Sequence, residues 1–252
     1  MSVTAEDIRS AATALQGHII RTPMLAAPML SRQFGCDLFV KLECQQYTSS
    51  FKARGAYIAM QSLNAAQRKA GVIAMSAGNH AQAVAYHAER MGIPAVIVMP
   101  AQTPFAKVAR TRAFGAEVVL EGRNLNECEG TVNTLIDERG LTLIHPYDNA
   151  LVMTGQGTVG LEMLEDEPDL DILVVPIGGG GLIGGIAAIA REMRPNIKII
   201  GVQTEAYPTM QLAIAGKEIE CGGETLAEGI AVKKPGNVTQ PVVAQLVDDI
   251  IL

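Results

Sequence analysis

The sequence contains no apolar run of about 18 residues, the length that a membrane-spanning helix needs. Its first ten residues include Glu6, Asp7 and Arg9, which do not fit the apolar segment of a secretory signal peptide. The 20 basic residues are scattered among 26 acidic ones, and the net charge is −6, which argues against a nucleic-acid partner. These absences predict a cytoplasmic protein with neither a membrane nor a nucleic acid as partner.

Cysteine and histidine are also scarce, with four of each. The cysteines are Cys36, Cys44, Cys128 and Cys221, and no pair has the C-x-x-C spacing of a zinc or redox site. The histidines, His18, His80, His87 and His145, are too dispersed to form a metal cluster by spacing alone. The cysteines are therefore expected to be small buried apolar residues in a reducing compartment.

A hydrophobic share of 48% in 252 residues allows a substantial core. Apolar runs of strand length alternate with helical periodicity, which predicts an α/β fold with mostly parallel sheets. Strands are expected at 38–42, 72–75, 95–99, 118–121, 142–145, 172–177 and 197–203. Helices are expected at 5–16, 50–61, 80–91, 107–114, 127–138, 158–164 and 182–193.

The regular β-α alternation within residues 71–148 predicts a small α/β domain. Residues 1–70 and 149–252 are expected to form a larger, discontinuous domain that holds the small one as an insertion. Each domain would contain an open, twisted, mostly parallel sheet with helices on both faces, and a cleft between domains is a favoured ligand site. Because residues 247–252 read as a strand, we expect the chain to be a fragment that lacks its C-terminal part.

Four consecutive glycines, Gly178 to Gly181, follow the strand at 172–177 and precede a helix. Without Cβ atoms, their backbone N–H groups can close around an anion at the N-terminus of that helix. Far upstream, Lys52 follows Ser49, Ser50 and Phe51. A lysine that forms an imine must be partly neutral, and burial among apolar groups favours the neutral form. A phosphate cup and a nucleophilic amine together indicate pyridoxal phosphate.

The turn Ser76-Ala77-Gly78-Asn79-His80 joins an expected strand to an expected helix, at the edge of a parallel sheet where ligands bind. Its hydroxyl, amide and free N–H groups can bind a carboxylate, and Asn79 can instead contact a cofactor ring hydroxyl. The alternative is an ordinary helix N-cap, for which serine and asparagine are also preferred. The residue types alone leave both readings open.

The glycine run has a second interpretation. Gly179, Gly181 and Gly184 match the G-x-G-x-x-G dinucleotide fingerprint, and Glu205 lies near the position expected for a ribose-binding acid. A nicotinamide enzyme would leave the lysine segment and the Ser76–His80 turn unexplained. Tight packing without a ligand would rarely need four successive glycines.

Four segments, in order along nearly the whole chain, resemble the threonine/serine dehydratases. They are Ser49-Ser50-Phe51-Lys52-Ala53-Arg54-Gly55-Ala56, Ser76-Ala77-Gly78-Asn79-His80-Ala81-Gln82, Gly178–Leu182 and Thr225-Leu226-Ala227-Glu228-Gly229-Ile230. This family belongs to the tryptophan-synthase-β-like, fold type II pyridoxal-phosphate enzymes, and serine racemase is a close relative. The resemblance outweighs the dinucleotide interpretation.

The resemblance implies a role for each matching residue. Lys52 would be the Schiff-base lysine, Phe51 would pack on the cofactor ring, and Asn79 would contact the ring hydroxyl. The phosphate cup would consist of Gly178, Gly179, Gly180, Gly181 and Leu182, with the backbone of Gly229 near the ring. The substrate carboxylate would lie among Ser76, Ala77, Gly78 and His80, with Gln156 of the Thr154–Thr158 segment, taken as a loop, as the next candidate.

The implied activity is removal of water and then ammonia from L-threonine or L-serine, which yields a 2-oxo acid. The alternatives are a 3-hydroxyaspartate dehydratase, a serine racemase, and a catalytically silent ligand-binding relative. Serine racemase has a serine, its second acid–base group, where this chain has Ala77. A monovalent or divalent cation beside the phosphate loop is implied at Glu205, although Gln211 replaces a helpful carboxylate. A homodimer or homotetramer is expected.

Overall fold

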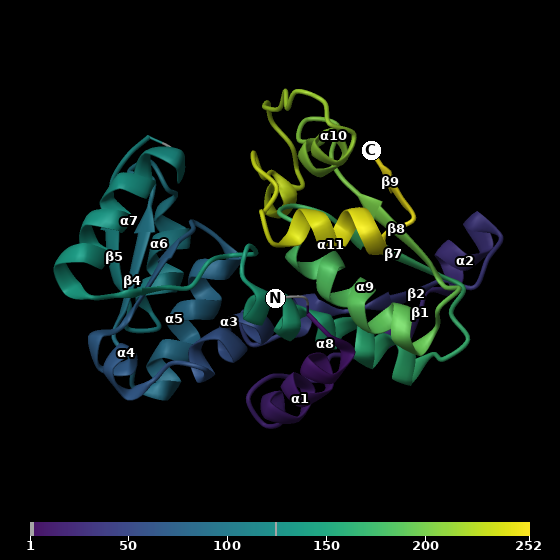
Figure 1. Cartoon of the computed structure of the whole chain (residues 1–252), viewed down its shortest axis with the longest axis horizontal. Helices are drawn as coiled ribbons and strands as arrows, with labels where there is room; N and C mark the ends of the chain where they lie inside the picture. Colours follow the sequence, from purple (N-terminus) through teal and green to yellow (C-terminus); the bar gives the residue numbers. More distant parts are fainter. Residues whose placement is uncertain (1–2, 124) are drawn as a thin grey trace.

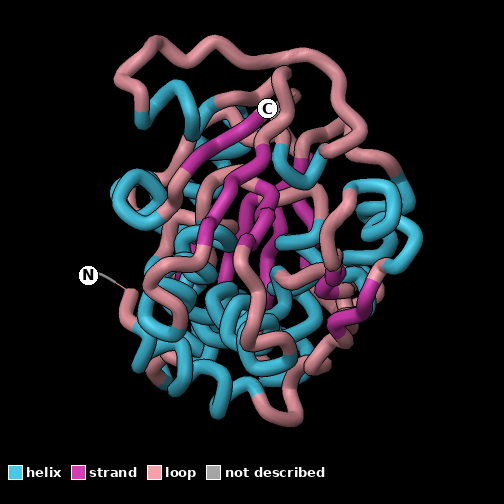
Figure 2. Tube along the Cα trace, turned by 90° about the vertical axis from the view of Figure 1, so that its right-hand side faces the viewer, coloured by secondary structure: helices cyan, strands magenta, loops and turns pink. Residues whose placement is uncertain are grey.

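The computed structural model describes residues 3–123 and 125–252. Two lobes lie side by side, one around the parallel strands within residues 72–143 and the other around those within residues 172–251 (Figure 1). In the perpendicular view the strands of both lobes overlap in the centre and helices surround them (Figure 2). The predicted α/β class with two parallel sheets is confirmed. Within the described part of the chain, no helix has both the length and the apolar character needed to cross a bilayer.

The smaller lobe contains a four-stranded parallel sheet in the order β5-β4-β3-β6. Its strands are β3 (Val72–Met75), β4 (Ala95–Met99), β5 (Glu117–Leu120) and β6 (Thr142–Leu143), and its helices are α5 (Asn79–Met91), α6 (Phe105–Arg112) and α7 (Leu125–Arg139). Alternate strand residues enter different cores: Val72 and Ala74 pack with residues of α5, and Ile73 packs with residues of α7. Both faces of this sheet are therefore covered.

The larger lobe contains a three-stranded parallel sheet in the order β7-β8-β9. Its strands are β7 (Ile172–Pro176), β8 (Lys198–Val202) and β9 (Asp249–Ile251). Its helices are α9 (Gly181–Met193), α10 (Thr209–Ile214) and α11 (Thr239–Leu246). Leu173 and Val175 of β7 are buried in a core shared with α9. On the opposite face of β7, Ile172 and Val174 are 50% and 62% exposed.

The N-terminal region contributes a third, two-stranded sheet that the sequence did not predict. Its elements are α1 (Ala5–Leu15), β1 (Met24–Ala26), α2 (Pro28–Phe34), β2 (Phe39–Lys41), the 3-10 turn η1 (Glu43–Gln45), α3 (Lys52–Gln61) and α4 (Ala65–Ala70). Strands β1 and β2 are antiparallel. The helix α1 begins with a capping box between Thr4 and Asp7, and its Ile8 is buried with Leu161 of α8 (Ala150–Asp166).

The helix α8 (Ala150–Asp166) corrects one prediction. We expected a loop at residues 154–158 and a helix only from 158 to 164, but the whole stretch is one buried helix. Glycine usually weakens a helix, yet here it allows close approach of neighbouring helices. A Cβ atom at Gly155 would lie 2.7 Å from the carbonyl oxygen of Arg54 in α3, and one at Gly157 would lie 2.8 Å from that of Gly185 in α9.

The helix α3 lies between the lobes. It contacts α8 on one side and α5 on the other, and its Ala56, Ala59 and Met60 belong to the core of the smaller lobe. Residues on both sides of the expected domain boundary at 70/71, such as Met60 and Val72, belong to this one core. The division into residues 1–70 plus 149–252 and residues 71–148 remains a proposal.

Candidate cofactor site

The glycine loop joins β7 to α9, and each of its glycines has little room for a side chain. Gly180 is the N-cap of α9 and has φ +93°, a left-handed conformation that favours glycine. A Cβ atom at Gly180 would lie 2.6 Å from Met210 Cε, and one at Gly178 would lie 2.9 Å from Val232 Cγ2. The first N–H groups of α9, a helix of 13 residues, have no partner within the helix and can bind an anion.

Lys52 is the first residue of α3 and lies three positions after Ser49, which has φ 55°. Its Nζ donates a 2.6 Å hydrogen bond to the carbonyl oxygen of Pro146 and lies 5.3 Å from the centroid of the Phe51 ring. Burial lowers the pKa of Lys52 to about 8. A substantial fraction of this amine is therefore neutral near physiological pH, as imine chemistry requires.

The turn between β3 and α5 contains the residues expected around a substrate carboxylate. Ser76 Oγ accepts a hydrogen bond from the N–H of Gly78, Asn79 is exposed at the first position of α5, and Ala77 packs against the smaller-lobe core. The early N–H groups of this 13-residue helix have no partner within it. The turn therefore offers N–H donors at the carboxyl end of the sheet.

His80 is buried, and its Nε2 lies 2.7 Å from the carbonyl oxygen of Ile144. Burial and the nearby charge of Lys52 lower the pKa of His80 to about 3, so the ring is neutral. A carbonyl oxygen only accepts, so the single ring proton is assigned to Nε2, which leaves the buried Nδ1 as an acceptor without a partner. In this state the imidazole has no free N–H to donate to a carboxylate, whereas the backbone of the turn has; the place of His80 beside the carboxylate stays a prediction.

Gln156 lies within α8, at its contact with α3. Its Oε1 accepts a 3.2 Å hydrogen bond from the N–H of Gly55, whereas its buried Nε2 has no partner. Two of the expected substrate-binding residues thus carry an unpaired buried polar atom, an acceptor on His80 and a donor on Gln156. Such atoms are costly unless a ligand or water pairs with them, so the site suits a polar ligand.

Gly229 and Glu205 lie in exposed loops. Gly229 belongs to the 3-10 turn η2 (Glu228–Ile230), and its carbonyl oxygen would lie 3.5 Å from a Cβ atom at Gly178, so this turn borders the glycine loop. Among the described residues, no group of three or more His, Cys, Asp or Glu side chains could hold a metal ion at Glu205 or elsewhere.

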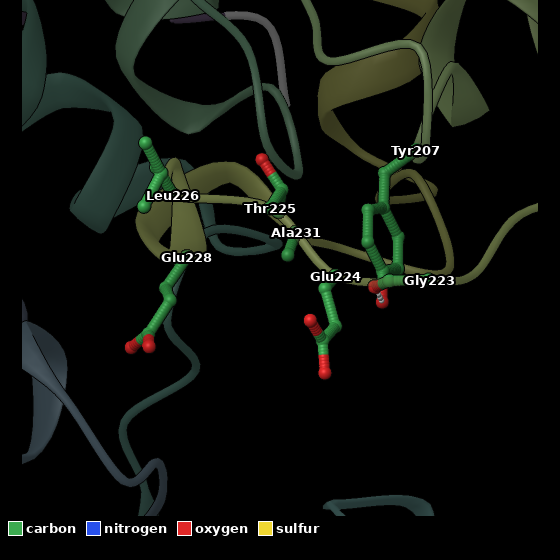
Figure 3. A pocket seen from close by; sticks show the side chains of 7 residues that line it. All are labelled: Tyr207, Gly223, Glu224, Thr225, Leu226, Glu228 and Ala231. Carbon is green, nitrogen blue, oxygen red and sulfur yellow. Dashed lines mark hydrogen bonds between the residues drawn. The ribbon is translucent and has the colours of Figure 1, made fainter.

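The loop around Gly229 also forms a shallow depression of about 580 Å³ (Figure 3). It is lined by Tyr207, Gly223, Glu224, Thr225, Leu226, Glu228 and Ala231. Glu228 accepts a 2.6 Å hydrogen bond from Lys107 of α6, which links this loop to the smaller lobe.

A buried ion network, which the sequence did not reveal, holds α3 in place. Arg54 is fully buried and donates to Glu162 at 2.6 and 2.8 Å and to Glu43 at 2.7 and 2.9 Å. Burial alone would lower the pKa of Arg54, but the hydrogen bonds that it donates to both carboxylates outweigh burial and raise it. Lys41 Nζ lies 2.7 Å from Glu162, so the network joins α3, α8 and β2.

The segment 144–149, between β6 and α8, connects the expected site residues. It accepts hydrogen bonds from His80 and Lys52, and the Tyr147 ring occupies the space beside Gly179. Sequence reasoning did not select these residues. Their one signal was a position directly after a parallel strand, at the same sheet edge as Ser76.

Comparisons with known proteins agree with this arrangement. The family model described as "Pyridoxal-phosphate dependent enzyme" matches residues 15–252. An L-threonine ammonia-lyase of Thermotoga maritima is 44% identical over 99% of this chain, which spans 63% of that relative. A catabolic L-threonine dehydratase of Staphylococcus aureus is 44% identical over 99% of this chain and 73% of its own length.

Solved structures of similar proteins cover the whole chain. Maize serine racemase superimposes with a TM-score of 0.95 at 36% identity, and the match covers 100% of this chain and 77% of that one. The processed threonine deaminase isoform 2 of Solanum lycopersicum gives a TM-score of 0.91 at 35% identity, covering 100% and 71%. The glycine loop at a helix N-terminus, the lysine of lowered pKa and these matches agree, and the chain belongs to the family of pyridoxal-phosphate-dependent enzymes.

Proposed function

We propose that the complete protein is an ammonia-lyase that converts L-threonine, or L-serine, to a 2-oxo acid and ammonia. One observation carries the proposal: the half-buried Lys52 donates a hydrogen bond from its amine to Pro146, while the adjacent Tyr147 lies on the glycine loop. A nucleophilic amine and an anion-binding loop therefore border the same short segment. The relatives named L-threonine ammonia-lyase and L-threonine dehydratase support this substrate class.

Pyridoxal phosphate, when bound, supplies a carbonyl carbon that amines can attack and a ring that accepts the electron pair released at the substrate Cα. The protein supplies position and proton transfer. Lys52, with its pKa lowered to about 8, can take the proton from Cα. The N–H groups of Gly178 to Leu182 would hold the phosphate, because they open a helix whose dipole favours negative charge.

The Ser76–His80 turn would bind the substrate carboxylate through N–H groups at the start of α5 and through Ser76 Oγ. The unpaired Nε2 of Gln156 is a candidate second donor. Phe51 would pack on the ring, Asn79 would contact its hydroxyl, and Gly229 would approach it through the backbone. A cation at Glu205 is a further prediction, and it would need oxygen ligands beyond acidic side chains, because among the described residues no set of three His, Cys, Asp or Glu gathers there. A homodimer or homotetramer and a cytoplasmic location are also predicted.

Serine racemisation is the second candidate function, because solved serine racemases superimpose closely on this chain. Inversion at Cα needs a proton donor on the face opposite Lys52. If the Ser76–His80 turn faces the substrate as proposed, Ala77 stands where such a donor would act, and its methyl group has no exchangeable proton. We therefore expect elimination to exceed racemisation, and Ala77→Ser to shift the ratio toward racemisation.

The full-length protein with pyridoxal phosphate should release 2-oxo acid and ammonia from L-threonine or L-serine faster than D-serine from L-serine. Borohydride reduction and peptide mapping should place the reduced cofactor on Lys52. Lys52→Ala should still admit the cofactor but lose elimination by several orders of magnitude. A reduced adduct on another lysine would disprove the assignment of Lys52. The proposed activity would be disproved if the cofactor-loaded protein converted only 3-hydroxyaspartate, or if it converted none of these substrates.

A further inference from the structure

The segment 144–149 accepts hydrogen bonds from two expected site residues on different helices. Lys52 of α3 donates to the carbonyl oxygen of Pro146 at 2.6 Å, and His80 of α5 lies 2.7 Å from that of Ile144. These carbonyl groups are two residues apart in the chain. The segment therefore forms one wall beside the reactive amine.

The next residue of this segment lies on the glycine loop. A Cβ atom at Gly179 would overlap the Tyr147 ring, and one at Gly181 would lie 3.2 Å from Cα, Cβ and O of Tyr147. Two of the four glycines thus leave space for Tyr147. Pro146 and Tyr147 together span the distance between the amine and the anion-binding loop, so a molecule held by both must lie beside them.

The far end of the Tyr147 side chain is anchored to the larger lobe. Its hydroxyl group donates a 3.0 Å hydrogen bond to the carbonyl oxygen of Lys234. The neighbouring Asp148 accepts hydrogen bonds from the N–H groups of Asn237 at 2.9 Å and Val238 at 2.6 Å, just before α11. These bonds fix the position of the Tyr147 ring beside the glycine loop.

We propose that Tyr147 retains the cofactor: its ring closes the side of the glycine loop and must move before pyridoxal phosphate can leave. This inference rests on the proposed cofactor role of the site. It assigns to Tyr147 a control of cofactor release that is separate from the chemistry at Lys52.

The test measures the rate at which the holoenzyme releases its cofactor in the absence of substrate. An excess of an unrelated apoenzyme captures the released cofactor, and the change in cofactor absorbance reports the transfer. Tyr147→Ala should release the cofactor about tenfold faster or more, because the ring is lost. Tyr147→Phe keeps the ring and should change release by less than about threefold. Tyr207→Ala is a matched control, because it removes a tyrosine whose hydroxyl also donates to a backbone carbonyl at 3.0 Å; its release rate should match the wild type.

A second variant tests the same contact if Tyr147→Ala folds poorly. Gly179→Ala adds a methyl group that overlaps the ring, so it should also speed release while Tyr147 is intact. In the Tyr147→Ala background the same change should add little, and this non-additivity identifies the contact. Unchanged release in both Gly179→Ala and a folded Tyr147→Ala would overturn the inference. A wild-type protein that binds no cofactor would instead overturn the proposed function.

Discussion

At the scale of single residues, Gly180 meets two constraints at once. Its φ of +93° is strained for any side chain, and an added Cβ would lie 2.6 Å from Met210 Cε and 2.9 Å from Thr239. Gly180→Val should therefore weaken cofactor binding and also lower the stability of the cofactor-free protein by about 1–3 kcal/mol. Cofactor titration and urea denaturation measure the two effects. Unchanged affinity in a destabilised variant would show that Gly180 serves packing alone.

His80 makes stability depend on pH. Its pKa is about 3 in the folded protein, against 6.5 for an ordinary histidine, so between these values the unfolded chain binds the extra proton. The contribution of neutral His80 to the free energy of unfolding is complete above pH 6.5 and is lost as the pH falls toward 3. At pH 5 the loss should be about 2 kcal/mol.

Urea denaturation of the wild type and of His80→Gln at pH 7.5 and pH 5 isolates this effect. Burial also lowers the pKa of His87, to about 4, but His87 contributes equally to the pH dependence of stability in both proteins. The stability difference between wild type and variant should therefore shrink at pH 5. A difference that is the same at both pH values would contradict the buried neutral state of His80.

At the scale of elements, one glycine of α8 and one of α7 give a matched pair of substitutions. A Cβ atom at Gly157 would lie 2.7 Å from Ile8 Cδ1 and 2.8 Å from the carbonyl oxygen of Gly185, so Gly157→Ala should cost about 1–3 kcal/mol. At Gly130 of α7 nothing lies within 4 Å, so Gly130→Ala should raise stability by up to about 1 kcal/mol. Thermal unfolding compares the two, and equal effects would refute the close helix packing.

Elements with strong apolar periodicity were predictable from the sequence. The strand at residues 95–99 matches its prediction, and α5 begins one residue earlier than expected. In contrast, α8 was read partly as a loop because its glycines serve contacts with α3 and α9 that only the fold reveals. The short helix α2 was not predicted, since it has no buried residue and thus no apolar face pointing to a core.

Residue type points to candidate site residues where it carries the chemistry, as for Lys52 and the glycine loop, and their roles stay predictions. Residue type did not point to Tyr147, because nothing in it relates a tyrosine four residues after β6 to glycines more than 30 positions later. The hydrogen-bond partner of His80 could not be predicted for a similar reason, and its place beside the carboxylate stays a prediction. Its ring proton is committed to Ile144, a partner that only the folded chain brings near.

At the scale of the whole molecule, one face of the larger sheet is open at β7. Ile172 and Val174 are 50% and 62% exposed, while Leu173 between them is 1% exposed. In the 252-residue chain, Ile172→Thr with Val174→Thr should reduce binding of the dye ANS, which detects exposed apolar surface, and change stability little. Leu173→Thr is the control, because it should destabilise the protein markedly. Equal dye binding before and after the double substitution would contradict the exposure of this face.

The position of α3 between the lobes has a consequence for how the protein acquires its chemistry. The paired strands of the smaller sheet come from residues 72–143 and those of the larger sheet from residues 172–251, so each sheet can form from its own continuous stretch. Helix α3 contacts α5 and α8, which belong to different halves, and is fully enclosed only after the two meet. Until then Lys52 is solvated and keeps the ordinary, fully protonated behaviour of a lysine. The lowered pKa of Lys52 thus requires the two halves to be packed around α3, and a chain in which they are apart has an ordinary lysine at this position.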